Sequence, residues 1–331
     1  MKQHTLGRTP LKISSLGLGC MGMSHAYGSP DDPESMRVLH RYVDLGGNFL
    51  DTAEVYGPYT NEELIGRFLR ETNRENLVIA TKFGFHIDPG TRTSTHEDSS
   101  PANIRKVCDE SLRRLGIDCI DLFYQHRVDP KRPIEEAVDT MSQLIDAGKI
   151  RTIGLSEASA DTLRRASVIH PIAALQSEYS LWTRDPEPNG VLTASLELGV
   201  TFVPFSPLGR GFLTGAIQSV SDIGEKDMRR ANPRFQEDAM KENLKLAETI
   251  KSLAKKKNCT PAQFAIAWVM AQGTNIVPIP GTKRLKYLEE NMSAINITFT
   301  PDELTEISET FPLHVFTGAR YPESMMSSVN R

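Results

Sequence analysis

The sequence contains little cysteine and no Cys-x-x-Cys pair. Its 331 residues include four cysteines, which are Cys20, Cys108, Cys119 and Cys259. Isolated cysteines at such spacings argue against a disulfide framework and against a zinc site, so we expect no metal centre. Free thiols buried in the core are the simplest interpretation of all four, and a reducing cytoplasm is the expected compartment.

Long apolar runs and a strong excess of charge are also lacking. No apolar run approaches the roughly 20 residues of a membrane span, and residues 1–8 lack the apolar core of a secretory signal. The formal net charge of −4 gives little attraction for nucleic acid or an anionic membrane. We therefore expect a cytoplasmic protein without a nucleic-acid or membrane partner, and the sequence leaves open whether it forms a homo-oligomer.

Short apolar runs alternate with helical patterns along the chain. The alternation implies a parallel sheet covered by helices, and eight repeats favour a closed (β/α)8 TIM barrel over an open sheet. The expected strands lie at 15–19, 47–51, 77–81, 119–124, 150–155, 172–176, 200–204 and 275–279. Five expected helices have both ends predicted and lie at 32–45, 101–115, 133–147, 187–198 and 284–293. For three others only the start is predicted, at 61, at 159 or 161, and at 261.

Three segments fall outside this repeat. Residues 2–14 suit a hairpin that closes the floor of the barrel, and residues 209–258 form a long insertion after the seventh strand, with a lysine-rich helix near 237–257. Residues 301–331 add a helix and an irregular tail. The insertion and the tail could be lids over a substrate or plain surface decoration. No low-complexity linker divides the chain, so we expect one domain, 1–331.

A glycine pattern near the N-terminus invites a dinucleotide-binding interpretation. Residues 17–22 match G-x-G-x-x-G, but that fingerprint requires a helix that starts on its last glycine and points its N-terminus at a pyrophosphate. Residues 23–30 read instead as a loop, and the next helical pattern begins only near Asp32. We therefore expect no Rossmann domain, and we expect these glycines to let the end of the first strand lie flat against a ligand.

Four polar residues follow the predicted second, third and fourth strands. They are Asp51, Tyr56, Lys82 and His126. Polar groups at the carboxyl ends of successive parallel strands face one rim of a barrel, where such folds keep their chemistry. A phenol beside an ammonium group is a proton donor with a pKa lowered toward neutrality, which suits carbonyl reduction. Each residue taken alone could instead be structural.

The stretch from Asn48 to Gly57, Asn-Phe-Leu-Asp-Thr-Ala-Glu-Val-Tyr-Gly, resembles the signature of the aldo-keto reductases. The resemblance runs from about residue 11 to 312. It continues in Ala-Thr-Lys at 80–82, in Asp-Cys-Ile-Asp-Leu-Phe-Tyr-Gln-His at 118–126 and in Ile-Val-Pro-Ile-Pro-Gly-Thr-Lys at 276–283. Residues 154–159 and 204–215 look like the perakine reductase and auxin-induced branch of that superfamily.

The resemblance implies a TIM barrel that binds NADPH across its C-terminal rim. It assigns the catalytic tetrad to Asp51, Tyr56, Lys82 and His126. Tyr56 would give its proton to the carbonyl oxygen, Lys82 would lower the pKa of Tyr56, and Asp51 would orient Lys82. His126 would hydrogen-bond the substrate oxygen, and the nicotinamide would supply hydride.

The resemblance also implies a set of cofactor contacts. Lys283 would pair with the adenosine 2′-phosphate, which favours NADP over NAD. Many relatives carry an arginine one turn later, near Tyr287 here, and Arg284 or Arg210 could compensate. The remaining contacts would be Ser156 and Gln176 to the carboxamide; Ser206, Leu208, Gly209, Arg210 and Gly211 around the pyrophosphate; Gly281 and Thr282 at a phosphate; and Glu290 and Asn291 at the adenine or ribose.

The predicted substrate contacts are Met21, Tyr27, Phe83 and Phe85, which suggest a largely apolar pocket for a small carbonyl compound such as an aromatic aldehyde. Core packing is the alternative for each of them.

Two other functions stay open at this point. The chain could be a cofactor-binding regulatory subunit, because voltage-gated potassium channel β subunits resemble the same family. It could also work mainly as an NADP-dependent alcohol dehydrogenase.

Overall fold

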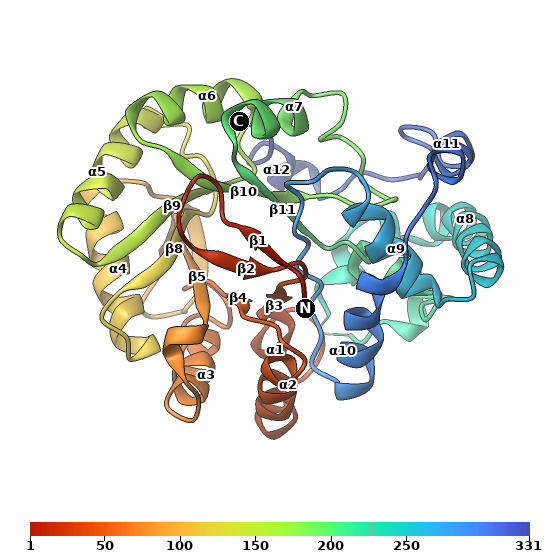
Figure 1. Ribbon diagram of the computed structural model, residues 1–331, viewed down its shortest axis with the longest axis horizontal. Helices are drawn as coiled ribbons and strands as arrows, with labels where there is room; N and C mark the ends of the chain where they lie inside the picture. Colours follow the sequence, from red (N-terminus) through yellow and green to blue (C-terminus); the bar gives the residue numbers. More distant parts are fainter. Residues whose placement is uncertain (226) are drawn as a thin grey trace.

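The structure, a computed structural model, describes residues 1–225 and 227–331. Its centre is a sheet of parallel strands surrounded by helices (Figure 1). The strand order is β11-β10-β9-β8-β5-β4-β3. The strands are β3 (Leu18–Gly19), β4 (Phe49–Asp51), β5 (Val78–Phe83), β8 (Ile120–Gln125), β9 (Ile150–Ser156), β10 (Ile172–Glu178) and β11 (Thr201–Phe205).

Residues 275–281 close the barrel between β11 and β3, although they do not form a regular strand. The amides of Val277 and Ile279 donate to Phe202 and Pro204 in β11, at 2.9 and 3.0 Å. On the other side, the carbonyl of Pro278 accepts from Gly17, at 3.0 Å. The predicted eighth strand is therefore in place but irregular, because Pro278 and Pro280 have no N–H to donate to a ladder.

The N-terminal hairpin closes the bottom of the barrel, as predicted. It consists of β1 (Gln3–Thr5) and β2 (Lys12–Ser14), which pair antiparallel and lie across the ring of strands in Figure 1. Leu6 and Ile13 are fully buried in the cluster that fills the barrel. The hairpin therefore acts as a plug, which leaves the opposite end of the barrel for a ligand.

The helices begin and end at the signals that the sequence provides. In α4 (Pro101–Leu115), the Ser100 side chain accepts from Asn103 and Gly116 ends the helix in the left-handed region. Thr260 forms a capping box with Gln263 at the start of α9 (Pro261–Met270). The other barrel helices are α2 (Asp32–Asp44), α3 (Thr60–Leu69), α5 (Ile134–Asp146), α6 (Ala160–Ile169), α7 (Val191–Leu198) and α10 (Leu285–Met292).

Alternation along the strands separates two apolar clusters. The inner cluster fills the barrel and includes Phe49, Val78, Ala80 and Leu122. The outer cluster lies between strands and helices. Because strand side chains alternate in direction, the residues two positions beyond Phe49 and Ala80 also face the barrel axis, and these are Asp51 and Lys82. The same pleat that fills the barrel with apolar residues therefore delivers two charged residues to its top.

Several elements lie beyond the repeat. A short hairpin, β6 (Phe85–Ile87) and β7 (Ser94–Glu97), follows β5 and was not predicted. The glycine pattern leads into one turn of helix, α1 (Met21–Ser24), where a loop was expected, and then into the expected loop. The insertion contains α8 (Glu237–Lys256) and the 3₁₀ turns η2 (Gly209–Thr214), η3 (Val220–Asp222), η4 (Met228–Ala231) and η5 (Pro233–Phe235). The tail contains α11 (Pro301–Thr310) and α12 (Glu323–Met326). Isolated 3₁₀ turns are η1 (Arg74–Asn76) and η6 (Ser293–Asn296).

The lengths and hydropathy of the helices bear on membrane insertion. Within residues 1–225 and 227–331, none is both long and apolar enough to span a bilayer.

Candidate active site

Three of the four predicted tetrad residues lie together at the top of the barrel. The Nζ atom of Lys82 donates to Asp51 Oδ1 at 2.5 Å and to the Tyr56 hydroxyl at 3.0 Å. It also donates to the carbonyl of Thr52 at 2.8 Å. All three donor positions of the ammonium group are therefore used, which fixes its orientation. A buried cation requires such full pairing, and Lys82 is completely shielded from solvent.

Burial and the neighbouring charges have opposite effects on the pKa of Lys82. Burial lowers this pKa, but Asp51 and Tyr56 together outweigh burial, and the pKa lies above its usual value. Burial raises the pKa of Asp51, while Lys82 and the Gln176 amide, which donates to Asp51 Oδ2 at 2.7 Å, oppose that rise. Lys82 is therefore positively charged at neutral pH, and Asp51 and Gln176 hold it in place.

The pKa of Tyr56 differs from the expectation. We expected Lys82 to lower it toward neutrality, but burial raises the pKa of the Tyr56 phenol by more than Lys82 lowers it. The hydroxyl therefore carries its proton at neutral pH. A protonated phenol can still donate its proton to a more basic oxygen, such as that of an alkoxide. Lys82 lies close enough to stabilise a phenolate if Tyr56 loses its proton.

His126, the fourth residue, lies directly after β8, where its amide donates to the carbonyl of Phe83 at 2.7 Å. Its ring meets the Tyr56 ring edge to face, with the centroids 5.7 Å apart, and meets Phe85 at 5.2 Å. Burial, followed by Lys82 and Arg127, moves the pKa of His126 well below its usual value, so the ring is neutral. Within the described part of the chain, Nδ1 has no hydrogen-bond partner.

The predicted carboxamide contacts lie beside the tetrad. Ser156 and Gln176 pair directly across the β9–β10 ladder, and both are buried. Gln176 donates to Asp51, and Arg127 donates to Ser156 Oγ at 3.3 Å. The sequence interpretation missed Arg127, although its position next to His126 is a signal that could have found it.

The segment 206–211, which was predicted to wrap a pyrophosphate and which we call the phosphate loop, has an unusual backbone. Ser206 and Arg210 have φ angles of 51° and 57°, which side chains with a Cβ seldom adopt. Gly209 and Gly211 also have positive φ, and the Gly211 amide donates to Leu208 at 3.0 Å. Arg210 belongs to this loop, but its guanidinium turns away to Glu178, at 2.9 Å.

The residues after the eighth barrel segment approach the first strand closely. Gly281 bridges to Gly19, where an added Cβ would lie 2.8 Å from the carbonyl of Ile279. The ammonium group of Lys283 donates to the carbonyls of Tyr27 and Ser29, each at 2.7 Å. Thr282 accepts from the Arg284 amide at 3.1 Å, and Glu290 and Asn291 lie on α10, with Asn291 buried.

The predicted substrate residues divide into two groups. Met21 and Tyr27 are half-buried, and Phe85 is half-buried against His126. Phe83 is a correction: it is fully buried in the outer cluster and packs on Phe123, with the centroids 5.0 Å apart. Because Lys82 faces the barrel axis, the pleat turns Phe83 toward the helices. Phe83 therefore supports the wall behind the site and does not line it.

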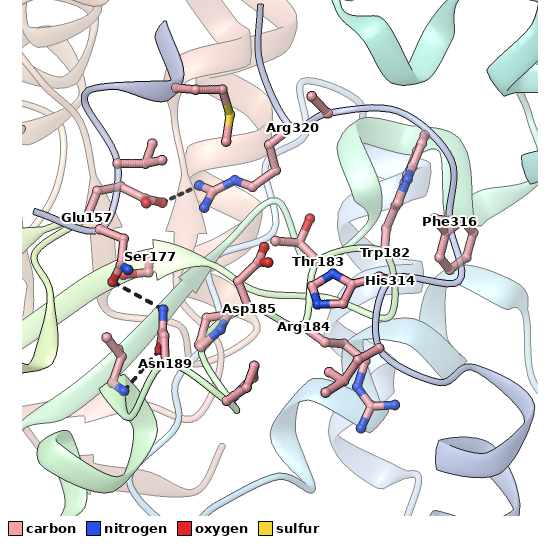
Figure 2. A pocket seen from close by; sticks show the side chains of 18 of the residues that line it. Glu157, Ser177, Trp182, Thr183, Arg184, Asp185, Asn189, His314, Phe316 and Arg320 are labelled. Atoms are coloured by element: carbon pink, nitrogen blue, oxygen red, sulfur yellow. Dashed lines mark hydrogen bonds and ion pairs between the residues drawn. The ribbon is translucent and has the colours of Figure 1, made fainter. Parts of the chain in front are cut away.

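A cavity of about 600 Å³ lies apart from the tetrad. It opens between the β10–α7 loop and the C-terminal tail (Figure 2). Its walls include Trp182 and Phe316 on the apolar side and Arg234 and Arg320 on the charged side. None of the four predicted tetrad residues lines it, so the cavity is a crevice under the tail.

Glu54 is a buried acid two residues before Tyr56. Its side chain is 3% exposed, and Oε1 has no hydrogen-bond partner in the described residues. Burial, and then repulsion by Glu62, raise the pKa of Glu54 to about 8. The folded protein therefore holds a proton that the unfolded chain releases near pH 4.5, so Glu54 makes the folded state less stable as the pH rises from about 4.5 to 8.

We expect Glu54→Gln to remove this pH dependence. Relative to the parent, the variant should gain stability between pH 5 and pH 8, by on the order of 4 kcal/mol. Urea unfolding at several pH values measures the difference. Parallel stability curves for the two proteins would contradict the account of a buried, protonated Glu54.

Known proteins resemble this chain over most of its length. The model of the Aldo/keto reductase family matches residues 15–311. The chain belongs to this family. A curated relative, the aldo-keto reductase yakc [NADP(+)] of Schizosaccharomyces pombe, is 43% identical over 320 residues, which cover 96% of this chain and 94% of that protein.

Two solved aldo-keto reductase structures are similar in fold. The glycerol dehydrogenase AKR11B4 from Gluconobacter oxydans superposes with a TM-score of 0.86 at 29% identity, over 96% of this chain and 97% of that one. The thermostable aldo-keto reductase Tm1743, in complex with the inhibitor epalrestat, superposes with a TM-score of 0.75 at 29% identity, over 94% of this chain and 100% of that one. The predicted TIM barrel and the predicted oxidoreductase class are thereby confirmed.

Proposed function

We propose that Tyr56, Lys82, Asp51 and His126 handle the proton in an NADPH-dependent reduction of aldehydes or ketones to alcohols. The observation that carries this assignment is the buried contact of Lys82 Nζ with both Tyr56 and Asp51. Family membership makes the chain a carbonyl oxidoreductase. It favours catalysis over a purely regulatory subunit, and the named relative supports NADP as the cofactor.

The residues at the rim fit a nicotinamide dinucleotide. The phosphate loop combines left-handed backbone with two glycines, which permits close approach of an anion. Lys283 adds a cation at the other side of the rim, beside the first strand. The bound nicotinamide would supply the hydride. We propose Ser156 and Gln176 at its carboxamide, and Ser206, Leu208, Gly209, Arg210, Gly211, Gly281, Thr282, Lys283, Glu290 and Asn291 along the rest of the cofactor.

Each tetrad residue has a separate task in the proposed mechanism. Tyr56 gives its hydroxyl proton to the carbonyl oxygen as negative charge develops there. Lys82 stabilises the phenolate, and Asp51 keeps Lys82 charged and oriented. His126, neutral and close to Tyr56, donates a ring N–H to the same oxygen and thereby stabilises its charge.

The predicted substrate contacts indicate the kind of substrate. Met21, Tyr27 and Phe85 suit a small, largely apolar carbonyl compound. Residues 154–159 and 204–215 support the perakine reductase and auxin-induced branch. We also propose that residues 1–331 act as one catalytic domain in the cytoplasm, without a nucleic-acid partner.

The proposed function is tested by mixing the protein with NADPH and 4-nitrobenzaldehyde. We expect NADPH absorbance to fall only when both the protein and the aldehyde are present. A wider panel of aldehydes and ketones then ranks substrates, and the reverse assay with alcohols and NADP at alkaline pH reveals the preferred direction. Tight cofactor binding without turnover across the panel would contradict the proposal and favour a regulatory role.

We expect Lys283→Ala to weaken the binding of NADPH more than the binding of NADH. Loss of the contacts from Lys283 to Tyr27 and Ser29 affects both cofactors, whereas loss of a 2′-phosphate contact affects NADPH alone. A charge-assisted contact of this kind predicts about a tenfold difference in KM between the two cofactors. Lys286→Ala, which alters an exposed lysine in the first turn of α10, three residues after Lys283, is the matched control. Equal losses of affinity for NADPH and NADH would show that Lys283 does not contact the 2′-phosphate.

A further inference from the structure

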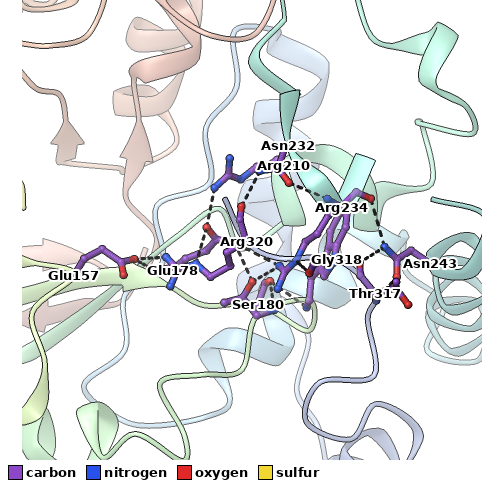
Figure 3. A network of polar contacts seen from close by, with 12 residues as sticks. Glu157, Glu178, Ser180, Arg210, Asn232, Arg234, Asn243, Thr317, Gly318 and Arg320 are labelled. Carbon is purple, nitrogen blue, oxygen red and sulfur yellow. Dashed lines mark hydrogen bonds and ion pairs between the residues drawn. The ribbon is translucent and has the colours of Figure 1, made fainter. Parts of the chain in front are cut away.

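Three arginines from separate parts of the chain converge on the carboxylate of Glu178, at the end of β10 (Figure 3). Arg210, in the phosphate loop, lies 2.9 Å from Glu178 Oε2. Arg320, in the C-terminal tail, lies 3.4 Å from the same oxygen. Arg234, in η5 of the insertion, lies 3.8 Å from Oε1. One buried carboxylate therefore joins a barrel strand, the phosphate loop, the insertion and the tail.

A second carboxylate completes this cluster. Glu157, just after β9, accepts from the Glu178 amide at 2.9 Å and from Arg320 Nη2 at 2.5 Å. Thr183 also bridges the group, because it donates to Glu178 at 2.9 Å and accepts from Arg234 at 2.6 Å. The cluster thus contains three guanidinium groups and two carboxylates.

The cluster is buried deeply enough for these charges to matter. The side chains of Glu178, Arg210 and Arg320 are 3%, 6% and 7% exposed. Burial alone would raise the pKa of Glu178, but the three arginines outweigh it and lower the pKa to about 2. Glu178 is therefore ionised, and removing its charge would leave three largely buried arginines facing one carboxylate.

The side chain of Arg210 is held from the side of the tail. Its guanidinium lies 4.5 Å from the ring centroid of Tyr321, next to Arg320 in the sequence, while its carbonyl accepts from Arg229 at 3.0 Å. These contacts use the Arg210 side chain to fix a loop whose backbone is in the left-handed region at two residues with a Cβ. Such a conformation is unfavourable for a residue with a Cβ and persists only where the surroundings hold it.

We propose that Glu178 is a positioning residue that couples the docked C-terminal tail to the phosphate loop, and that this coupling sets the affinity for NADPH. The inference rests on the proposed function, in which residues 206–211 wrap the pyrophosphate. With the cluster intact, the loop is ordered before the cofactor arrives. With the cluster broken, binding must also order the loop, so the affinity falls.

The decisive variant is Arg320→Met, because it alters the tail and leaves the phosphate loop unchanged in sequence. It leaves two arginines and two carboxylates in the cluster but removes the Arg320 contact of Glu157, so far-UV circular dichroism is used to establish that the variant is folded. We expect the Kd for NADPH, measured by fluorescence titration, to rise about tenfold. The kcat at saturating NADPH should stay within about twofold, because the tetrad is not touched.

Lys256→Met is the matched control. It removes an exposed ion pair, between α8 and α11, with Glu306 at 3.8 Å. We expect this control to bind NADPH like the parent protein. An unchanged Kd in folded Arg320→Met would overturn the proposal, as would an equal loss of affinity in the control.

A double-mutant cycle tests the coupling itself. We expect Arg210→Met to weaken the binding of NADPH as well. The variant that carries both substitutions should bind NADPH about as weakly as the single variant with the higher Kd. Glu178→Gln should reproduce that loss. If the increase in Kd of the double variant equals the product of the increases in the two single variants, the two effects are independent, and the proposed coupling is overturned. Turnover of 4-nitrobenzaldehyde by the parent protein tests the proposed function separately from this cycle.

Discussion

Replacing Tyr56 by phenylalanine is expected to lower the rate of carbonyl reduction by about 10²–10⁴-fold, the usual contribution of a positioned proton donor. The substitution removes one hydroxyl and preserves the ring. Lys82 keeps its contacts with Asp51 and Thr52, so the fold and the charge of Lys82 should persist. Stopped-flow or steady-state NADPH oxidation with 4-nitrobenzaldehyde measures the rate.

The affinity for NADPH provides the control for this variant. Because the Tyr56 hydroxyl contacts Lys82 and belongs to none of the proposed cofactor contacts, Tyr56→Phe should bind NADPH within about twofold of the parent protein. Rapid turnover by a folded variant would refute the role of Tyr56 as proton donor. A parallel loss of cofactor binding would instead show that Tyr56 shapes the cofactor site.

Replacing Lys82 by methionine is the second large effect that we expect. The variant loses the group that stabilises the phenolate, so reduction should again fall by at least about 10²-fold. It also leaves Asp51 buried with Gln176 as its remaining side-chain donor. Breaking a buried ion pair in this way costs about 3–5 kcal/mol of stability, because one charge is left without compensation.

The pH dependence separates the electrostatic cause from simple loss of packing. Without Lys82, the pKa of Asp51 should rise further above its usual value, since burial then acts with less opposition. A raised pKa makes the folded state less stable as the pH rises, so the stability lost in Lys82→Met should be smaller near pH 4 than near pH 7. Urea unfolding at both pH values measures it.

A second substitution provides the matched comparison. Adding Asp51→Asn to Lys82→Met removes both charges, so stability should largely return while reduction stays low. A double variant that is as unstable as Lys82→Met would contradict the electrostatic account.

The sequence predicted the meeting of Asp51 and Lys82 because the periodicity of strands is regular. Asp51 and Lys82 lie at inward positions at the top of neighbouring strands, and parallel pairing brings them within 2.5 Å. The same rule, applied one residue further, would have placed Phe83 outside the barrel, and our prediction missed this. The balance that sets the pKa of Tyr56 was also missed, because burial cannot be judged from neighbours in the sequence.

Other features depend on contacts that no local pattern encodes. The irregular eighth segment follows from Pro278 and Pro280, whose missing amides were visible in the sequence but whose partners in β3 and β11 were not. The cluster around Glu178 joins residues 142 positions apart, from Glu178 to Arg320, through the path of the tail. Such a path is decided by tertiary packing, so the sequence could suggest the tail as a lid but not its anchor.

The most direct test of the central claim is a single-turnover experiment in H₂O and D₂O with NADPH already bound. If Tyr56 delivers a proton as hydride reaches the carbonyl carbon, the parent protein should reduce 4-nitrobenzaldehyde more slowly in D₂O, and Tyr56→Phe should lose both the fast phase and this dependence. A fast phase of equal size in Tyr56→Phe, with the same response to D₂O, would contradict the account.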